Sequence, residues 1–136
     1  MSCFLLKIVT PDGLQFEGQA ERLIVRTTTG DVAILANHIN YVAPLGMGQA
    51  LVVTEDGQRR TAACIGGMLS VINGQVDLVP TTFEWADKID LNRANQAYDR
   101  ADKILKYHKS SDTDIKMAEA RLRRALVRKS VAQMKY

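Results

Sequence analysis

The period of the hydrophobic pattern changes within residues 83–93, and this change constrains the fold more than any other feature of the chain. Upstream, Gln75–Val79 alternates polar and apolar side chains, as a β-strand does. Downstream, apolar residues recur at helical spacings of three and four; they are Leu91, Ala94, Tyr98, Ala101 and Leu105. Acidic residues between the two patterns suit the positive end of a helix dipole. The sequence therefore predicts β structure before this stretch and helix after it.

Residues 1–83 are predicted to form an antiparallel β-sandwich domain. Turn signals such as Asp56-Gly57 and Asn73-Gly74 separate short runs rich in Val, Ile, Leu and Thr, and no helical pattern intervenes. The expected strands are Phe4–Thr10, Arg22–Thr28, Asp31–Leu35, Ala50–Thr54, Arg60–Ile65, Leu69–Ile72 and Gln75–Val79. The pair Gly66-Gly67 between two of these strands indicates a bulge or a close approach of two backbones.

Residues 84–136 are predicted to form an antiparallel two-helix hairpin. The first helix is expected from about Asp90 to Tyr107 and the second from about Thr113 to Met134, with Ser111 or Asp112 as the cap of the second. One face of the second helix is expected to carry Ile115, Ala118, Leu122, Ala125 and Leu126. Isolated helices of this length are marginal in water. The hairpin is therefore either a fixed packing element or one that exchanges between the sandwich, a ligand-bound form and a partner.

Composition argues against several classes of protein. A hydrophobic content of 46% and a charged content of 24% are typical of a soluble globular chain, and no secretory signal or membrane span is visible, so we expect an intracellular protein. The two cysteines are expected to be buried free thiols. We find no catalytic triad, carboxylate pair, metal-ligand spacing or phosphate loop, and we expect His38 to be a loop residue. A free-standing enzyme is the least favoured class.

Positive charge is concentrated in the helical half. Residues 1–82 carry five Lys and Arg against seven Asp and Glu, whereas residues 83–136 carry thirteen against eight. Arg121, Arg124 and Arg128 form one stripe on the second helix, and Arg93 on the first could reach them if the hairpin closes. Such a stripe is usually a solvated face, but it can also hold a polyphosphate or an acidic protein segment. Nucleic-acid binding is a rival hypothesis, disfavoured by the acidic first half and the scarcity of aromatic residues among the basic ones.

Several ordered motifs carry a resemblance that covers essentially the whole chain. They are Val9-Thr-Pro-Asp-Gly13, Gly30-Asp-Val-Ala-Ile-Leu-Ala-Asn-His38, Ala43-Pro-Leu45, Gly66-Gly67, Ile89-Asp-Leu-Asn-Arg-Ala94 and Ser130-Val-Ala. In this set and order the chain resembles the epsilon-subunit family of the bacterial F-type, proton-translocating rotary ATP synthase. That family implies a sandwich of about ten strands followed by two C-terminal helices.

The resemblance also implies a role without catalysis. Members of the family belong to the central rotor stalk, couple the gamma subunit to the ring of c subunits, and lie at the cytoplasmic face of the cell membrane as peripheral proteins, monomeric when isolated. Their helices can extend toward the alpha and beta subunits and inhibit ATP hydrolysis. The alternative is a purely structural rotor coupler whose hairpin is fixed and does not sense ATP.

Some members of the family bind ATP in the folded hairpin as a regulatory ligand. Their motif, Ile or Leu followed by Asp-x-x-Arg-Ala, matches this chain at Ile89, Asp90, Arg93 and Ala94. Their remaining ATP contacts, a Glu ahead of the motif and two Arg on the second helix, fall on Glu84, Arg124 and Arg128. The resemblance and the arginine stripe thus indicate the same site, and the sequence leaves open whether Mg²⁺ accompanies the nucleotide.

The chain departs from the family pattern in one loop. The usual Gly-Ile-x-Pro-Gly-His is here Ala33-Ile-Leu-Ala36-Asn37-His38, with two Gly and one Pro replaced. The resemblance implies partner contacts at His38 and at Asp31, which matches an acidic position facing the c-ring loop. The three replacements, at Ala33, Ala36 and Asn37, bear on the detailed contacts around His38.

Overall fold

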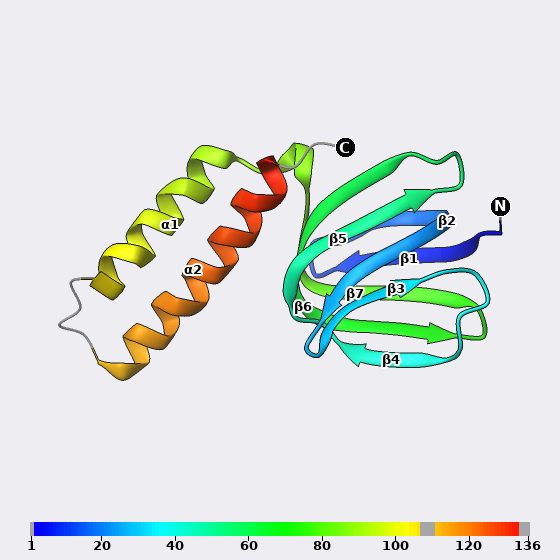
Figure 1. Ribbon diagram of the computed structural model, residues 1–136, viewed down its shortest axis with the longest axis horizontal. Helices are drawn as coiled ribbons and strands as arrows, with labels where there is room; N and C mark the ends of the chain where they lie inside the picture. The colour runs from blue at the N-terminus through cyan, green and yellow to red at the C-terminus, as the bar shows by residue number, and fades with distance from the viewer. Residues whose placement is uncertain (1, 107–110, 134–136) are drawn as a thin grey trace. The chain divides into compact units, whose positions relative to one another are not determined.

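The computed structural model describes residues 2–106 and 111–133, and the chain divides into two compact units after Trp85 (Figure 1). The first unit is all β structure. Its last strand runs two residues past the expected boundary at Phe83, because Glu84 and Trp85 still pair with Ala63 and Ala62 of the neighbouring strand. The second unit holds a short 3-10 turn and two helices, η1 (Ala86–Lys88), α1 (Leu91–Lys106) and α2 (Asp112–Gln133). The expected helix ends at Tyr107 and Met134 lie outside the described residues.

Seven strands make up the β unit within the described residues. They are β1 (Phe4–Thr10), β2 (Gly13–Thr27), β3 (Gly30–Ile34), β4 (Tyr41–Pro44), β5 (Met47–Thr54), β6 (Arg59–Ile72) and β7 (Gln75–Trp85). Every pairing is antiparallel except that of β1 with β7, which is parallel. β1 lies where it was expected, and β3 begins and ends one residue earlier than expected. β2, β5 and β7 are longer than expected, the expected strands Arg60–Ile65 and Leu69–Ile72 form the single strand β6, and β4 was not expected.

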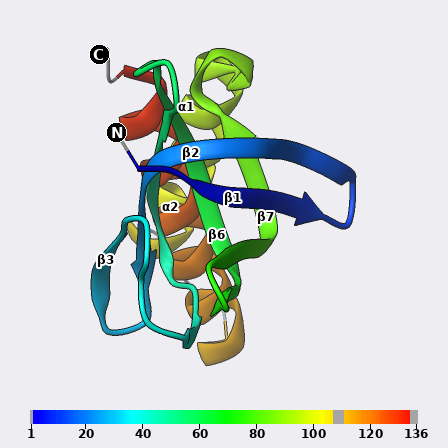
Figure 2. The same ribbon diagram turned by 90° about the vertical axis from the view of Figure 1, so that its right-hand side faces the viewer.

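The hydrogen-bonded ladder closes on itself. Its order is β1-β7-β6-β5-β2, and β2 pairs again with β1. Figure 2 shows β2 running from its turn with β1 on one side of the unit to its hairpin with β3 on the other. Each half of β2 therefore has different partners, β1 for the first half and β3 and β5 for the second. If the halves of β2, β6 and β7 are counted separately, the seven strands correspond to the ten expected segments.

Alternating side chains of these strands fill the space inside the closed ladder. Leu6, Ile8, Leu23, Val52 and Leu78 are fully buried and belong to one hydrophobic cluster. The alternation follows from the period of two along a strand, which sends every second side chain to the inner face. The sandwich is thus one continuous sheet folded around its own core. The fold class that the sequence predicted, an antiparallel β-sandwich, is confirmed.

The pair Gly66-Gly67 marks the point at which β6 changes neighbours. β5 pairs with β6 up to Ile65, and β4 pairs with it from Met68 onward. The register with β7 does not shift across the pair, so the feature is a close backbone approach and not a bulge. A Cβ on Gly67 would lie 2.1 Å from the carbonyl oxygen of Val79, and φ there is +100°. Only glycine fits this position.

Trp85, the last residue of β7, is held by its neighbours at the end of the β unit. The ring of Phe83 meets it edge-on with centroids 4.8 Å apart, and the ring of Phe16 does so at 6.4 Å. The Arg60 guanidinium lies 3.8 Å from the indole centroid, a cation–π contact. The chain therefore leaves the sheet from a fixed point.

Replacing Gly67 with Ala is expected to destabilise the β unit by about 2–4 kcal/mol, because the new Cβ collides with the β7 backbone and the left-handed φ strains an L residue. Urea unfolding followed by circular dichroism measures the change. Gly18→Ala is the matched control, since its Cβ would meet nothing closer than 3.8 Å. Equal midpoints for the two variants would contradict the close approach.

Alkaline pH is expected to weaken the fold through Cys64, because burial raises the pKa of its thiol from 9.0 to about 12. Below pH 9 the thiol is neutral in both the folded and the unfolded chain, so it does not change the free energy of unfolding. Between pH 9 and 12 the unfolded chain ionises first, so the unfolding free energy falls, by at most about 1.4 kcal/mol per pH unit. Urea unfolding over this range should show the fall in wild type and in Cys3→Ala, and a shallower one in Cys64→Ala.

Candidate functional site

Each helix of the second unit begins at a side-chain cap. The Asp90 carboxylate accepts a hydrogen bond from the Arg93 backbone N–H at 3.1 Å, and the Asp90 carbonyl accepts one from Ala94 N–H. At the second helix the Ser111 hydroxyl accepts a hydrogen bond from Asp114 N–H at 3.3 Å, so Ser111 is the cap and Asp112 the first helical residue. Both interactions satisfy donors that a helix start would otherwise leave unpaired. The carboxylate of Asp90 therefore has a structural role.

The two helices meet along a seam of small side chains. The buried residues of the hairpin are Ala94, Ala101, Ala118, Ala125 and Val131. Alanines seven residues apart on both helices let the backbones approach closely but bury little apolar area, and burial is what stabilises such helices. Lys129 adds a cation–π contact to the ring of Tyr98 at 5.1 Å. The hairpin is therefore weakly held for its length.

One expectation about this seam was wrong. Leu126 was placed on the buried face of the second helix, but its side chain is 51% exposed. It follows Ala125 directly and so lies about 100° further round the helix, outside the narrow contact that alanines allow. The rest of the expected face agrees with the structure, since Ala118 and Ala125 are buried and Ile115 and Leu122 are half-buried.

A groove of about 420 Å³ lies between α1 and α2, and four arginines line it. Arg100 comes from α1, and Arg121, Arg124 and Arg128 come from α2. The remaining lining residues are Ala97, Ala101, Ile104 and Ala125. Among the described residues, no carboxylate lines this groove. Guanidinium groups from two helices thus face one concave space, an arrangement suited to a multiply charged anion.

The groove contains some of the predicted ligand residues and not others. Arg124 and Arg128 line it, and both are half-buried. Ile89, Asp90, Arg93 and Ala94 lie at the start of α1, before the lining residues begin at Ala97. Glu84 lies on β7 in the other unit.

Sequence reasoning missed Arg100, which the groove adds to the set. A signal for it exists, because Arg93 and Arg100 are seven residues apart and so share a helical face with Ala97 and Ile104. This signal is weaker than that of the stripe on α2, because α2 carries three arginines on one face and α1 only two at such a spacing.

The β unit places Asp31 and His38 in different environments. Asp31 pairs with Arg26 across the β2–β3 hairpin, with Nε 3.0 Å from Oδ1. His38 lies in a loop, where its Nδ1 is 2.7 Å from the carbonyl oxygen of Ile39 and its ring meets Tyr41 edge-on. Asn37, one of the departures from the family pattern, has a φ of +65°. Asn tolerates this conformation, so the replaced glycine is compensated locally.

The outer face of β4, β6 and β7 exposes apolar side chains. Met68, Ile72 and Val79 lie on it together with Val42, and their exposed fractions run from 44% to 59%. The register puts them on one side, since Met68 pairs with Val79 and Ser70 with Val42, while the alternate residues of β6 are fully buried. A cluster of exposed apolar side chains on one sheet face is a candidate interaction site. We call these four residues the outer apolar face.

Both halves of the chain match family models. Residues 3–86 match the model of the ATP synthase delta/epsilon chain beta-sandwich domain. Residues 87–133 match that of the ATP synthase delta/epsilon chain long alpha-helix domain. Within the helices that the structure describes, none is long and apolar enough to cross a membrane. No cluster of three or more potential metal-ligating side chains occurs in the described ranges.

Relatives that match this chain over nearly their whole length are ATP synthase epsilon chains. The ATP synthase epsilon chain of Bacillus velezensis is 42% identical over 132 residues, covering 97% of this chain and 98% of the relative. That of Ruminococcus albus is 40% identical over 136 residues, covering 99% and 100%. Among solved structures, a chain of the Euglena gracilis mitochondrial ATP synthase has a TM-score of 0.79 at 22% identity, covering 90% of this chain and 77% of that one. A chain of the Tetrahymena thermophila mitochondrial ATP synthase has a TM-score of 0.61 at 13% identity, covering 95% and 96%.

Removing the side-chain amide of Asn95 is expected to stabilise the hairpin. Its Oδ1 is buried without a hydrogen-bond partner among the described residues, and such a group costs about 1–3 kcal/mol. Asn95→Ala should therefore slow amide hydrogen exchange throughout α1 and α2 more than Asn92→Ala, an exposed control with the same change in helix propensity. Faster exchange in Asn95→Ala than in the control would show that the amide is stabilising.

Proposed function

This chain belongs to the ATP synthase delta/epsilon chain family, and from that membership we propose that it is a non-catalytic subunit of the central rotor stalk whose hairpin binds ATP and regulates hydrolysis. In this proposal the β unit couples the gamma subunit to the c-ring at the cytoplasmic face of the membrane. The helices close on ATP in one state, and in the other they extend toward the alpha and beta subunits and inhibit them.

The convergence of four arginines on one groove carries the regulatory part of this proposal. Arg100 belongs to α1 and the other three arginines to α2, so an anion between them bridges the two helices. Without an anion, like charges in the groove repel one another and favour separation of a seam that is held mainly by alanines. A triphosphate replaces this repulsion with charge-assisted hydrogen bonds. The ligand therefore acts directly on the contact that keeps the hairpin closed.

The length of ATP fits the distance between the groove and the motif at the start of α1. Arg100 lies six positions after Ala94, which corresponds to about 9 Å along a helix axis. With the phosphates among the arginines of the groove, the nucleoside would lie toward Ile89–Ala94. Arg93, seven residues before Arg100 on the same face, would then contact the phosphate chain from that end.

The strength of the switch depends on ATP concentration relative to affinity. At a concentration equal to the dissociation constant, ATP stabilises the closed hairpin by about 0.4 kcal/mol, and at a thousandfold excess by about 4 kcal/mol. A seam that buries few large side chains opens at low energetic cost, so a stabilisation of this size is enough to decide its state. A tight site keeps the hairpin closed in an energised cell, and a weak one responds to ATP depletion.

The outer apolar face supports the coupling part of the proposal. An exposed apolar surface on a sheet is suited to a stable protein partner, and we assign it to the gamma subunit. The Asn40 side chain accepts a hydrogen bond from the Asn73 N–H just after β6, and we assign His38, two residues before Asn40, to the same partner contact. Asp31 lies on the β2–β3 hairpin, and we assign it to the c-ring loop.

A structural coupler with a fixed hairpin is the second candidate function. The outer apolar face favours it, since docking on a stalk needs no movement of the helices. It differs from the leading proposal in one consequence, namely that the arginines of the groove would then be a solvated basic surface and ATP would not alter protection of the hairpin.

Calorimetric titration of ATP into the isolated protein is expected to give a dissociation constant on the order of 1–100 µM. The double variant Arg124→Ala/Arg128→Ala should abolish the heat, and Arg100→Ala should weaken binding by about tenfold, because each removes charged donors from the groove. Arg123→Ala, an exposed neighbour that does not line the groove, is the matched control. Repeating the titration with and without Mg²⁺ determines whether the metal accompanies the nucleotide.

Two results would count against the proposed site. Absence of heat in the wild type up to millimolar ATP would remove the regulatory ligand and leave the structural coupler. Equal losses in Arg123→Ala and Arg100→Ala would show that ATP responds to the overall basic charge of the helices and not to the groove.

A further inference from the structure

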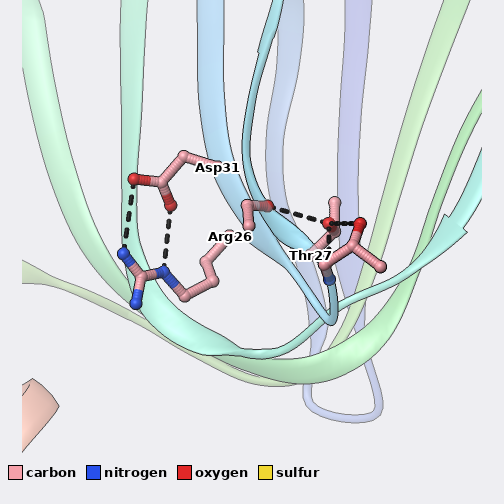
Figure 3. A network of polar contacts seen from close by, with 5 residues as sticks. Arg26, Thr27 and Asp31 are labelled. Atoms are coloured by element: carbon pink, nitrogen blue, oxygen red, sulfur yellow. Dashed lines mark hydrogen bonds and ion pairs between the residues drawn. The ribbon is translucent and has the colours of Figure 1, made fainter.

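The side chains of Arg26 and Asp31 form a two-point contact on the β2–β3 hairpin. The two residues face each other across the strand pair, and Figure 3 shows both hydrogen bonds. Nε lies 3.0 Å from Oδ1 and Nη2 lies 3.4 Å from Oδ2. This contact raises the pKa of the Arg26 guanidinium, chiefly through the hydrogen bond to Asp31. The carboxylate is thus held in one plane although both side chains are more than half exposed.

Two glycines make room for the Arg26 stem. A Cβ on Gly48 would lie 2.7 Å from the Arg26 Cβ and 3.1 Å from its Cδ, and one on Gly46 would lie 3.5 Å from its Cγ. The aliphatic part of Arg26 therefore lies flat against this segment at the start of β5. The segment Gly46-Met47-Gly48 thus supports an arginine, whereas its glycine pattern is too short for a nucleotide loop.

The backbone below the contact is fastened independently of it. Gly46 N–H donates to the Arg26 carbonyl at 3.0 Å, and Thr28 N–H donates to that of Pro44 at 3.1 Å. The Thr27 hydroxyl donates to the Gly30 carbonyl at 2.8 Å and closes the turn, as Figure 3 shows. These bonds hold the backbone of the hairpin without using the Arg26 guanidinium, which donates its hydrogen bonds to Asp31.

Each carboxylate oxygen can accept two hydrogen bonds, and Arg26 uses one on each. The remaining acceptor positions face away from Arg26, toward solvent. From this geometry we propose that Arg26 is a positioning residue that presents the free acceptor positions of Asp31 to N–H donors of the c-ring loop. The inference rests on the proposed function, which assigns Asp31 to that loop. Because the ion pair has no net charge, it fits a polar loop presenting backbone or amide N–H groups.

Rebinding of the full chain to ATP synthase complexes stripped of this subunit tests the inference. Asp31→Asn, which loses a charged acceptor, is expected to weaken rebinding by about tenfold. Arg26→Gln should weaken it by about two- to fivefold, the range of an exposed ion pair, and Arg26→Lys by less, since Lys keeps the charge but not the planar fork. The double variant Arg26→Gln/Asp31→Asn should bind no more weakly than Asp31→Asn alone, because both act through one carboxylate.

Gly48→Ala displaces Arg26 without changing either charge. It should weaken rebinding as Arg26→Gln does, while Gly18→Ala should have no effect. In the isolated protein the Nε–H proton of Arg26 should give a nuclear magnetic resonance signal protected from water exchange. This signal should be lost in Asp31→Asn and in Gly48→Ala. A merely structural role of Arg26 would change thermal unfolding but not follow this pattern.

The outcomes separate the inference from the function on which it rests. If Asp31→Asn rebinds normally, Asp31 does not contact the c-ring and both statements fail. If Asp31→Asn weakens rebinding but Arg26→Gln and Gly48→Ala do not, the c-ring contact stands and the positioning role is overturned. Additive losses in the double variant would also overturn it, because Arg26 would then contact the partner by itself.

Discussion

Pairing of β1 with both β2 and β7 closes the sheet, and the rest of the β unit depends on that closure. A closed ladder leaves β3 and β4 as the strands outside the ring, so backbone groups that would otherwise need covering are satisfied within the unit. The core then lies inside a single folded sheet, where side chains such as Leu6, Leu23 and Leu78 are removed from water. Because the core lies inside the sheet, the outer surfaces do not have to be buried for the unit to fold. They can therefore carry an apolar face and an exposed ion pair.

The helical unit is built on the opposite principle. Its seam consists mainly of alanines, and a groove beside it gathers positive charge. The side-chain Oδ1 of Asn95 is buried with no partner in the part of the chain that the structure describes. None of these features favours a permanently closed hairpin, and all are compatible with one that a ligand closes. The two units therefore suit different roles. The β unit is stable and keeps one structure, whereas the helical unit is marginally stable, so that a ligand can change its state.

The sequence predicted which segments form strands and helices better than it predicted which segments contact one another. The change of period located the junction, and Asp-Gly and Asn-Gly turns located the hairpins, because these signals are local. β4 was missed because its four residues, Tyr41–Pro44, form a strand only by pairing with β6 beyond Gly67. The exposure of Leu126 was missed because a helical pattern gives the face but not the width of a contact. The role of Arg100 in the groove was missed because it depends on which α2 residues lie opposite Arg100. The spacing of residues within α1 does not carry that information.

The anchoring of Trp85 has a mechanical consequence for a protein proposed to turn within a rotor. Any tension on the helices reaches the sheet through the end of β7, and sheets under tension at a strand end fail by peeling from that end. Here the first event of peeling would be extraction of an indole from contact with Phe83, Phe16 and Arg60, before the ladder with β6 begins to open. A side chain with three aromatic and cationic contacts thus lies at the strand end through which the load enters.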